Sequence, residues 1–347
     1  MATEAATPVA VANQVRARRR LTSRLASLAV VAVAVLLPLI PPFNGQDYTR
    51  WLIGAAFMAA MAVAFDFTAG YINIVNFGFA AFVGVGAYTS GLLAANLGIS
   101  PWIGMFAGAA VAGFVGLLTG MLTLRLRGIY AAVMTWFVGL ALMGLARNLT
   151  VITRGSLGLN VPLLLDTPDN LPYYYVILGM MLVTITVLTV AIRSDLGLAF
   201  RAIGQNLQSA RASGINPTRF LVINFTLSCA FAGWLGGFYA HYYGILTPDI
   251  MLTSHTVEVL AVAYIGGRGS LWGPAIIAYP LTIGVEVLRT QFSNLPGLHL
   301  VLYGVLLIAV MIFWPSGFAG VVRSAGTRLE ARWMARATKA AGAAEAA

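Results

Sequence analysis

The chain is organised as long apolar runs separated by short polar gaps. A membrane-spanning helix needs about 20 mostly apolar residues, and runs near this length recur throughout. The candidates are Leu25–Ile40, Trp51–Phe67, Phe77–Leu97, Trp102–Leu124, Ile129–Asn148, Tyr174–Ile192, Phe220–Tyr243, Val257–Ile265, Trp272–Leu288 and His299–Trp314. Val257–Ile265 is too short to span alone, so it must extend upstream, belong to a broken helix or be re-entrant. The pattern predicts an all-α polytopic membrane protein with about ten transmembrane helices.

Several arginines precede the first run. Such a cluster before an apolar stretch resembles a secretory signal peptide, but Pro41 and Pro42 follow directly and no small-x-small cleavage site is seen. We therefore interpret the first run as an uncleaved span. This interpretation divides the chain into a cytoplasmic N-terminal arm (residues 1–24), a transmembrane domain (25–316) and a basic cytoplasmic tail (317–347).

Composition and charge agree with a membrane protein. Hydrophobic residues make up 59% of the 347 residues and charged residues only 9%, whereas soluble domains carry about 25% charged residues. The net charge is +10. This charge does not indicate a nucleic-acid partner, because the basic residues lie in short gaps between apolar runs and form no groove-sized patch.

The basic residues also predict the orientation, because positively charged loops stay in the cytoplasm. With a cytoplasmic N-terminus and ten crossings, 17 of the 21 basic residues fall in the cytoplasm and 4 fall outside. The outer four are Arg50, Arg147, Arg154 and Arg289. This skew predicts that both termini are cytoplasmic.

One segment, AFRAIGQNLQSARASGIN at Ala199–Asn216, is polar although apolar runs flank it. A narrow apolar stripe recurs there at helical spacing, formed by Leu198, Ala202, Ile203, Leu207 and Ala210. Gly214 stands where a helix-ending glycine is expected. The spacing predicts a short amphipathic helix on the cytoplasmic surface over Ala199–Arg211. It favours neither of two roles: a helix lying on lipid headgroups, or one that docks in a groove of a soluble partner.

The stretch TAGYINIVNFGF at Thr68–Phe79 interrupts an apolar run. Broken backbone in a membrane is tolerated where it is buried in protein or lines a cavity, and broken helices often form transport sites. Asn73, Asn76 and Gly78 are therefore candidates for a translocation path. The alternative is close helix packing through small residues, which we favour for Gly78.

A few charged residues lie within or beside the apolar runs. Intramembrane charge is costly and is a functional hypothesis by default. Glu258 joins the candidate translocation path because it lies near the outer end of its run. Arg289 is one turn from Glu286, so a local ion pair is the simpler explanation for these two. No His/Cys metal spacing occurs in the sequence, and we expect neither a metal nor a cofactor.

The sequence contains no G-x-x-x-x-G-K-[ST] motif, and its single lysine is Lys339. The chain is therefore not expected to hydrolyse ATP through a phosphate-binding loop, and we do not expect an enzyme. Transport energy would come from another subunit or from an ion gradient. The second possibility leaves open a secondary transporter or channel for small neutral or zwitterionic solutes.

Three segments in order resemble the permeases of ABC importers for branched-chain amino acids, in particular the LivM-type subunit of the LivH/LivM family. They are GYINIVNFGFAAFVGVGAY at Gly70–Tyr88, GLAFRAIGQNLQSARASGINPTRFLVINFTLSCAFAGWLGG at Gly197–Gly237, and GGRGSLWGPAIIA at Gly266–Ala278. The resemblance implies a location in the bacterial inner membrane. It also implies three kinds of partner: a LivH-type second permease, two cytoplasmic ATP-binding subunits, and a periplasmic or lipid-anchored solute-binding protein.

The resemblance further implies that the loop at residues 193–219 holds a coupling helix, which docks on the ATP-binding subunit. The residues expected to contribute to this coupling are Arg201, Ala202, Asn206, Leu207, Ala210 and Gly214. The chain departs from the family where Gly204 and Gln205 precede Asn206, because family members often carry a charged residue there.

Overall fold

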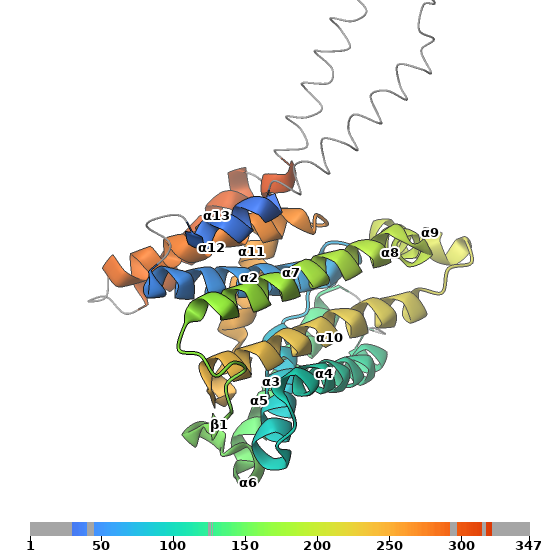
Figure 1. Cartoon of the computed structure of the whole chain (residues 1–347). Coiled ribbons are helices and arrows are strands. Elements are labelled where there is room, and N and C mark those ends of the chain that lie inside the picture. The colour runs from blue at the N-terminus through green and yellow to red at the C-terminus, as the bar shows by residue number, and fades with distance from the viewer. Residues whose placement is uncertain are drawn as a thin grey trace, which may run out of the picture.

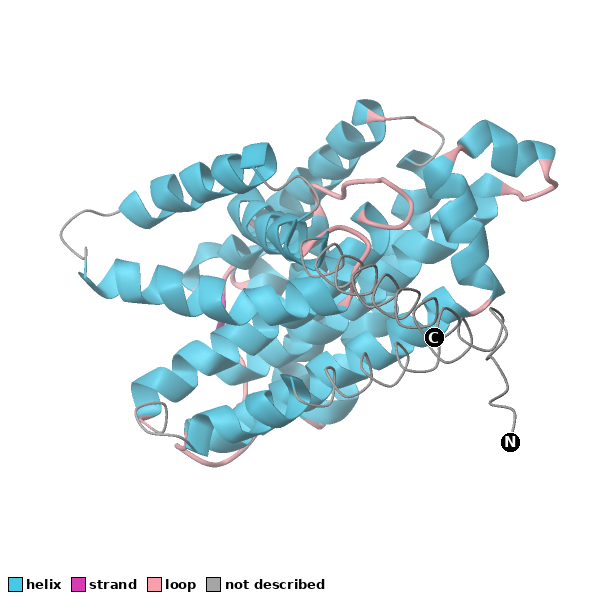
Figure 2. Ribbon diagram, turned by 90° about the horizontal axis from the view of Figure 1, so that it is seen from above, coloured by secondary structure: helices cyan, strands magenta, loops and turns pink. Residues whose placement is uncertain are grey.

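The computed structural model describes residues 30–39, 45–123, 126, 128–291, 297–313 and 317–320. Most of these residues are helical (Figure 2). The predicted N-terminal arm, nearly all of the tail and the start of the first apolar run lie outside the described residues.

Six helices of the described chain are long and apolar enough to cross a membrane. They are α2 (Gln46–Ala69), α3 (Phe79–Leu97), α4 (Pro101–Thr123), α5 (Ile129–Asn148), α7 (Asn170–Arg193) and α10 (Pro217–Tyr243). Each coincides with a predicted run, so the all-α polytopic membrane architecture is confirmed. The total of about ten crossings stays a prediction.

The remaining predicted runs also coincide with helices. These are α11 (Thr253–Gly266), α12 (Trp272–Gln291), α13 (Leu298–Phe313) and the short apolar segment Val30–Leu39, which ends in the 3-10 turn η1 (Leu37–Leu39). α11 extends upstream of its predicted start, yet its 14 residues are still fewer than the about 20 that a complete crossing needs.

Helix α2 lies at the centre of the structure, between α7, α10, α11 and α12. Every residue from Ala59 to Ala69 is buried. A helix that is apolar on all sides is expected to be enclosed by other helices. The many alanines of α2 let those neighbours approach closely, which is how helices associate in membranes.

Helices α3, α4 and α10 form a second tightly packed group. The closest contacts in this group are made by glycines, whereas α2 packs through alanines. A Cβ added to Gly86 would overlap the backbone of Gly233, and one added to Gly236 would overlap the Val83 carbonyl. The α3–α10 distance therefore depends on the absence of side chains at these positions.

The two ends of the bundle carry different structures (Figure 1). At one end, two short helices, α8 (Asp195–Gln205) and α9 (Leu207–Ala212), connect α7 to α10. At the other end, β1 (Leu159–Asn160) pairs antiparallel with β2 (Ile245–Leu246). The short turns α6 (Thr150–Thr153), η2 (Gly155–Leu157) and η3 (Pro248–Met251) accompany these strands. We name these the α8–α9 end and the β end.

The glycine packing predicts opposite effects for the same substitution at two positions. Gly236→Ala should destabilise the protein by about 1–3 kcal/mol, because the new methyl group overpacks the α3–α10 contact. Gly179→Ala should be neutral or stabilising by up to about 1 kcal/mol, since Gly179 in α7 has open space around its Cα and alanine favours helix. Melting temperatures in detergent measure both effects. Equal melting temperatures for the two variants would contradict this packing.

Candidate functional site

The polar segment between α7 and α10 folds as two helices, so the prediction of one continuous helix over Ala199–Arg211 was wrong. Asn206 has an extended backbone (φ −155°, ψ 110°) and separates α8 from α9. Its side-chain oxygen accepts hydrogen bonds from the backbone N–H groups of Gln208 (2.9 Å) and Ser209 (3.0 Å). Asparagine is a strong helix N-cap, and here this local preference restarts the helix.

The buried face of α8 also differs from the predicted stripe. Leu198 was expected on the apolar side but is 64% exposed. Phe200 is buried instead, and its ring packs edge-on against Phe67 of α2 (5.6 Å between centroids) and near Phe220 of α10 (6.4 Å). One large aromatic ring therefore determines how α8 faces the bundle, because it buries more apolar area than the alanines of the stripe.

The predicted coupling residues have different surroundings. Ala210 is buried, Ala202 and Leu207 are half-buried, and Arg201, Asn206 and Gly214 are exposed. Gly214 has a positive φ (+83°), and the following N–H at Ile215 bonds back to the Ala210 carbonyl (3.1 Å). This is a glycine-terminated helix end, as predicted.

The end of α8 rests on the backbone that follows α2. A Cβ at Gly204 would overlap the carbonyl oxygen of Tyr71, so a glycine is needed for this contact. The Asn73 side-chain amide donates a hydrogen bond to the Gly204 carbonyl (2.6 Å). The Arg201 guanidinium lies over the Tyr71 ring, 6.0 Å from its centroid. The segment that connects α7 to α10 is thus attached directly to the α2–α3 connection.

Asn73 joins this connection to a third segment, the loop between α11 and α12. Its side-chain oxygen accepts a hydrogen bond from the Arg268 guanidinium (2.6 Å). The Asn73 backbone is in the left-handed region (φ 55°), which asparagine tolerates better than most residues. Asn73 therefore bridges α8 and the α11–α12 loop.

Asp66 makes a second link to the same loop. It is fully buried near the end of α2, and one carboxylate oxygen accepts a hydrogen bond from the backbone N–H of Gly269 (3.0 Å). A Cβ at Gly70 would overlap that same N–H, so these backbones are in close contact. We name the contacts among residues 66–73, 200–204 and 268–269 the junction. The junction brings together the three segments on which the sequence resemblance rests.

Asn76 and Gly78 lie away from the junction, where α3 begins. The buried Asn76 side chain accepts a hydrogen bond from the Gly78 N–H (3.0 Å). A Cβ at Gly78 would overlap the Thr135 carbonyl of α5. In this structure the two residues form the turn that leads into α3, and Gly78 allows α3 to pack closely against α5.

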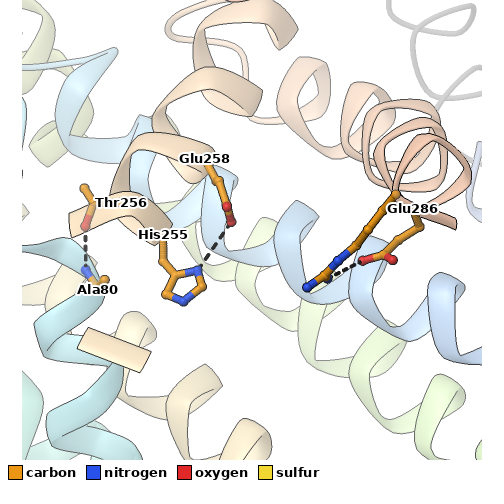
Figure 3. A network of polar contacts seen from close by, with 6 residues as sticks. Ala80, His255, Thr256, Glu258 and Glu286 are labelled. Atoms are coloured by element: carbon orange, nitrogen blue, oxygen red, sulfur yellow. Dashed lines mark hydrogen bonds and ion pairs between the residues drawn. The ribbon is translucent and has the colours of Figure 1, made fainter. Parts of the chain in front are cut away.

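A cavity of about 490 Å³ lies toward the β end, between α2, α3, α10, α11 and α12. Its size is within the range of small-molecule sites. Glu258 is in its lining, and a His255 ring nitrogen lies 3.4 Å from the Glu258 carboxylate (Figure 3). Of the four residues predicted for the translocation path, Glu258 alone is among the described lining residues.

Helix α12 contributes a second charged pair to the cavity. The Arg289 guanidinium lies 3.7 Å from the Glu286 carboxylate, and both residues line the cavity. The predicted local ion pair is therefore present. We name this space the Glu258 cavity; it combines charged groups with an apolar wall and can hold a small polar solute.

Sequence reasoning missed Phe200, Arg268 and the junction role of Asn73. The sequence could have indicated a role for Arg268, because this arginine lies among glycines within one of the three segments that resemble the family. The Asn73 signal was weaker, since asparagine suits a left-handed bend as well as a solute contact.

Substitutions at Asn73 should separate its hydrogen bonds from its backbone conformation. Asn73→Ala loses both side-chain bonds and places alanine in a left-handed conformation that costs about 1–2 kcal/mol. Asn73→Gly loses the same bonds without that cost, so it should melt at a higher temperature than Asn73→Ala. Asn148→Ala, which removes a local bond to Gly144 at the β end, is the control for losing an exposed asparagine. Identical melting of the Ala and Gly variants would rule out the left-handed conformation.

Comparison with known proteins places the chain in a family. The family model described as branched-chain amino acid transport system, permease component, matches residues 48–311. The permease protein LivM of Salmonella typhimurium is 26% identical over 86% of this chain and 76% of its own length. For LivM of Escherichia coli the identity is 27%, over 76% and 68%. For LivH of Salmonella typhimurium it is 24%, over 80% and 96%.

No solved structure matches the chain. The family model nevertheless covers well over half of it, and the helices have the length and composition of membrane spans. The chain therefore belongs to the permease component family of branched-chain amino acid transport systems and is a multi-pass inner-membrane subunit of an ABC importer.

Proposed function

We propose that this permease translocates branched-chain amino acids or related small polar solutes. It would pair with a LivH-type permease, two cytoplasmic ATP-binding subunits and a periplasmic or lipid-anchored solute-binding protein. Relatives named for high-affinity branched-chain amino acid transport support the solute class. A relative named for autoinducer 2 import supports keeping the class open to other small polar solutes.

The proposed orientation places the α8–α9 end in the cytoplasm and both termini on the same side. Its support is the charge distribution. Arg193, Arg201, Arg211, Arg219 and Arg268 lie in the elements of the α8–α9 end, whereas the four arginines predicted to be outside lie in elements toward the β end. About ten crossings would place both termini on that side, if α11, α12 and α13 each count as one crossing.

The contacts at the junction are the observation that supports the coupling role. A helix that transmits force needs a firm attachment to the membrane domain, and α8 has one through Phe200, Gly204 and Asn73. Movement of α8 would reach the α11–α12 loop through Asn73 and Arg268. The docking face would be the exposed side of α8 and α9, which includes Arg201 and Gln208.

The structure changes the proposed roles within the coupling loop. Ala210 is only 3% exposed, so it would hold α9 against its own chain and would not meet a partner. Asn206 would set the angle between α8 and α9 through its capping bonds. Arg201 is an exposed coupling candidate whose charged side chain would contact the ATP-binding subunit, whereas the exposed Asn206 side chain is used in the cap of α9.

The proposed transport cycle is alternating access. The binding protein would deliver solute at the β end, to the Glu258 cavity. ATP binding would move the coupling loop and, through the junction, shift α11 and α2, whose other halves line that cavity. Asn73, Asn76 and Gly78 would then act through the α2–α3 connection and its packing, and Glu258 through contact with the solute.

Cysteine labelling of intact cells tests the orientation. Leu157 is 92% exposed at the β end and Ser209 is exposed in α9, whereas the native Cys229 is buried. Leu157→Cys should react with a membrane-impermeant maleimide, and Ser209→Cys should react only after permeabilisation. The unsubstituted chain gives the background. Labelling of Ser209→Cys in intact cells would overturn the proposed orientation.

Charge reversal on the docking face tests the coupling role. The double variant Arg201→Glu, Gln208→Glu should reduce the amount of co-purified ATP-binding subunit at least tenfold, because each new carboxylate must be desolvated at the interface. Both side chains are exposed, so the melting temperature of the chain itself should fall only slightly, since an exposed cation–π contact such as that of Arg201 with Tyr71 contributes about 0.5–1 kcal/mol. Co-purification and melting are measured on the same preparation.

Two further variants complete this experiment. Arg154→Glu changes the same charge on an exposed residue at the β end and should leave co-purification unchanged. Ala210→Asp should instead lower the melting temperature, because it buries a carboxylate within the chain. Full retention of the ATP-binding subunit by the double variant would exclude docking through this face.

A further inference from the structure

The buried side chain of Asp66 leads to an inference about how coupling works, which rests on the proposed function. Asp66 has no exposed surface. Its Oδ1 atom accepts the hydrogen bond from the Gly269 N–H (3.0 Å), whereas its Oδ2 atom has no hydrogen-bond partner among the described residues. Buried polar atoms nearly always have a partner, and a buried carboxylate without a cation is costly. The second oxygen of Asp66 therefore calls for an explanation.

Arg268 is a cation beside this carboxyl group. It directly precedes Gly269, so its Cα lies within about 6 Å of the Asp66 Oδ1 atom, which an arginine side chain can cover. In this structure the guanidinium has other contacts. It donates a hydrogen bond to the Asn73 side-chain oxygen (2.6 Å) and lies over the Tyr264 ring, 5.1 Å from its centroid. The ion pairs of the described chain include neither Arg268 nor Asp66.

The position of α8 determines which partner Arg268 takes. A hydrogen bond between a guanidinium and a carboxylate is stronger than one to a neutral amide, but the exposed Arg268 must lose water to reach Asp66, and this cost offsets part of the gain. Asn73 presents its oxygen to Arg268 because its amide is fixed on the Gly204 carbonyl of α8 (2.6 Å). The Asn73–Arg268 bond therefore depends on α8 staying in place.

The backbone around Arg268 suits a change of partner. Arg268 lies between Gly267 and Gly269, whose φ angles are +108° and +70°. Glycine adopts such angles without steric cost and has the widest choice of alternative conformations. The Arg268 side chain can therefore turn from one partner to the other through small changes in two flanking residues, while α11 and α12 stay intact.

We propose that Arg268 exchanges Asn73 for Asp66 during the coupling cycle. While α8 rests on the α2–α3 connection, Arg268 binds Asn73. When α8 withdraws and the bond from Asn73 to Gly204 breaks, the guanidinium turns to the Asp66 Oδ2 atom and forms a buried ion pair. This pair fixes the α11–α12 loop in a second position on the end of α2. Asp66 and Arg268 are thus positioning residues, and their ion pair belongs to the state in which α8 is displaced.

The first test is a double-mutant cycle on the purified full chain, followed by its melting temperature in detergent. Asn73→Gly releases Arg268 and keeps the left-handed backbone without strain. In that background Arg268 pairs with Asp66, so adding Asp66→Asn should lower the melting temperature by about 3 °C or more. In the otherwise unsubstituted chain, Asp66→Asn should leave the melting temperature unchanged or raise it. The asparagine oxygen still accepts from Gly269, and an amide costs less to bury than a carboxylate.

Two controls belong to this cycle. Adding Arg268→Gln to the Asn73→Gly background should abolish the effect of Asp66→Asn, because no cation is left to pair. Asp47→Asn makes the same change at an exposed carboxylate in the first turn of α2 and should have no effect in either background. If Asp66→Asn shifts the melting temperature equally with and without Asn73, the two side chains do not compete for Arg268 and the proposal is wrong.

ATP-dependent leucine uptake by the complete importer in proteoliposomes tests the role in coupling. Asp66→Asn should reduce uptake at least fivefold although the variant melts no lower, a combination that a merely structural role would not give. Arg268→Lys keeps the cation and should retain more uptake than Arg268→Gln. Unchanged uptake by the Asp66→Asn importer would overturn the exchange. Absence of leucine uptake by the unsubstituted importer would instead refute the proposed solute class, and the melting cycle would then decide the exchange by itself.

Discussion

The structure depends on how the broken backbone between α2 and α3 finds hydrogen-bond partners. Backbone polar groups inside a membrane cannot be left without partners. The Thr135 hydroxyl of α5 accepts from the Phe77 N–H, the Asn76 side chain from the Gly78 N–H, and the Thr256 hydroxyl of α11 from the Ala80 N–H. Two of these three partners come from α5 and α11, so the connection is stable only while these two helices stay packed against it.

The same requirement explains the junction. A connection that leaves the helix at Gly70 exposes further backbone, and Gly204 and Gly269 approach it closely enough for direct contact. The Asn73 side chain then bonds to groups on both of these segments. Because the α2–α3 connection is held by α8 on one side and by the α11–α12 loop on the other, a displacement of α8 must either break these bonds or move the loop.

Sequence patterning predicted the helices well, because apolar runs of membrane length have few other stable structures. It failed within the segment between α7 and α10, where the choice between one helix and two depended on the single capping side chain of Asn206. The break in α2–α3 was predictable from glycines and asparagines, but the partner of each asparagine was not. Asn73 and Asn76 are three residues apart in similar sequence. The Asn73 side chain bonds to Gly204 of α8, whereas the Asn76 side chain bonds to Gly78 just before α3, because only the packed neighbours distinguish them.

The junction and the Glu258 cavity are connected through the same two helices. Helix α11 carries Glu258 near its start and leads into the loop with Arg268 at its end. Helix α2 lines the cavity with its first half and places Asp66 against Gly269 with its last turn. An α-helix of 14 residues is short and stiff, so a shift of its loop end moves Glu258 with it. The buried Asp66 side chain accepts a hydrogen bond from the loop backbone and so fixes the end of α2 relative to the end of α11. Release of the junction would therefore change the separation between the charged lining of the cavity and its apolar wall, and with it the shape of the space that the proposed solute would occupy.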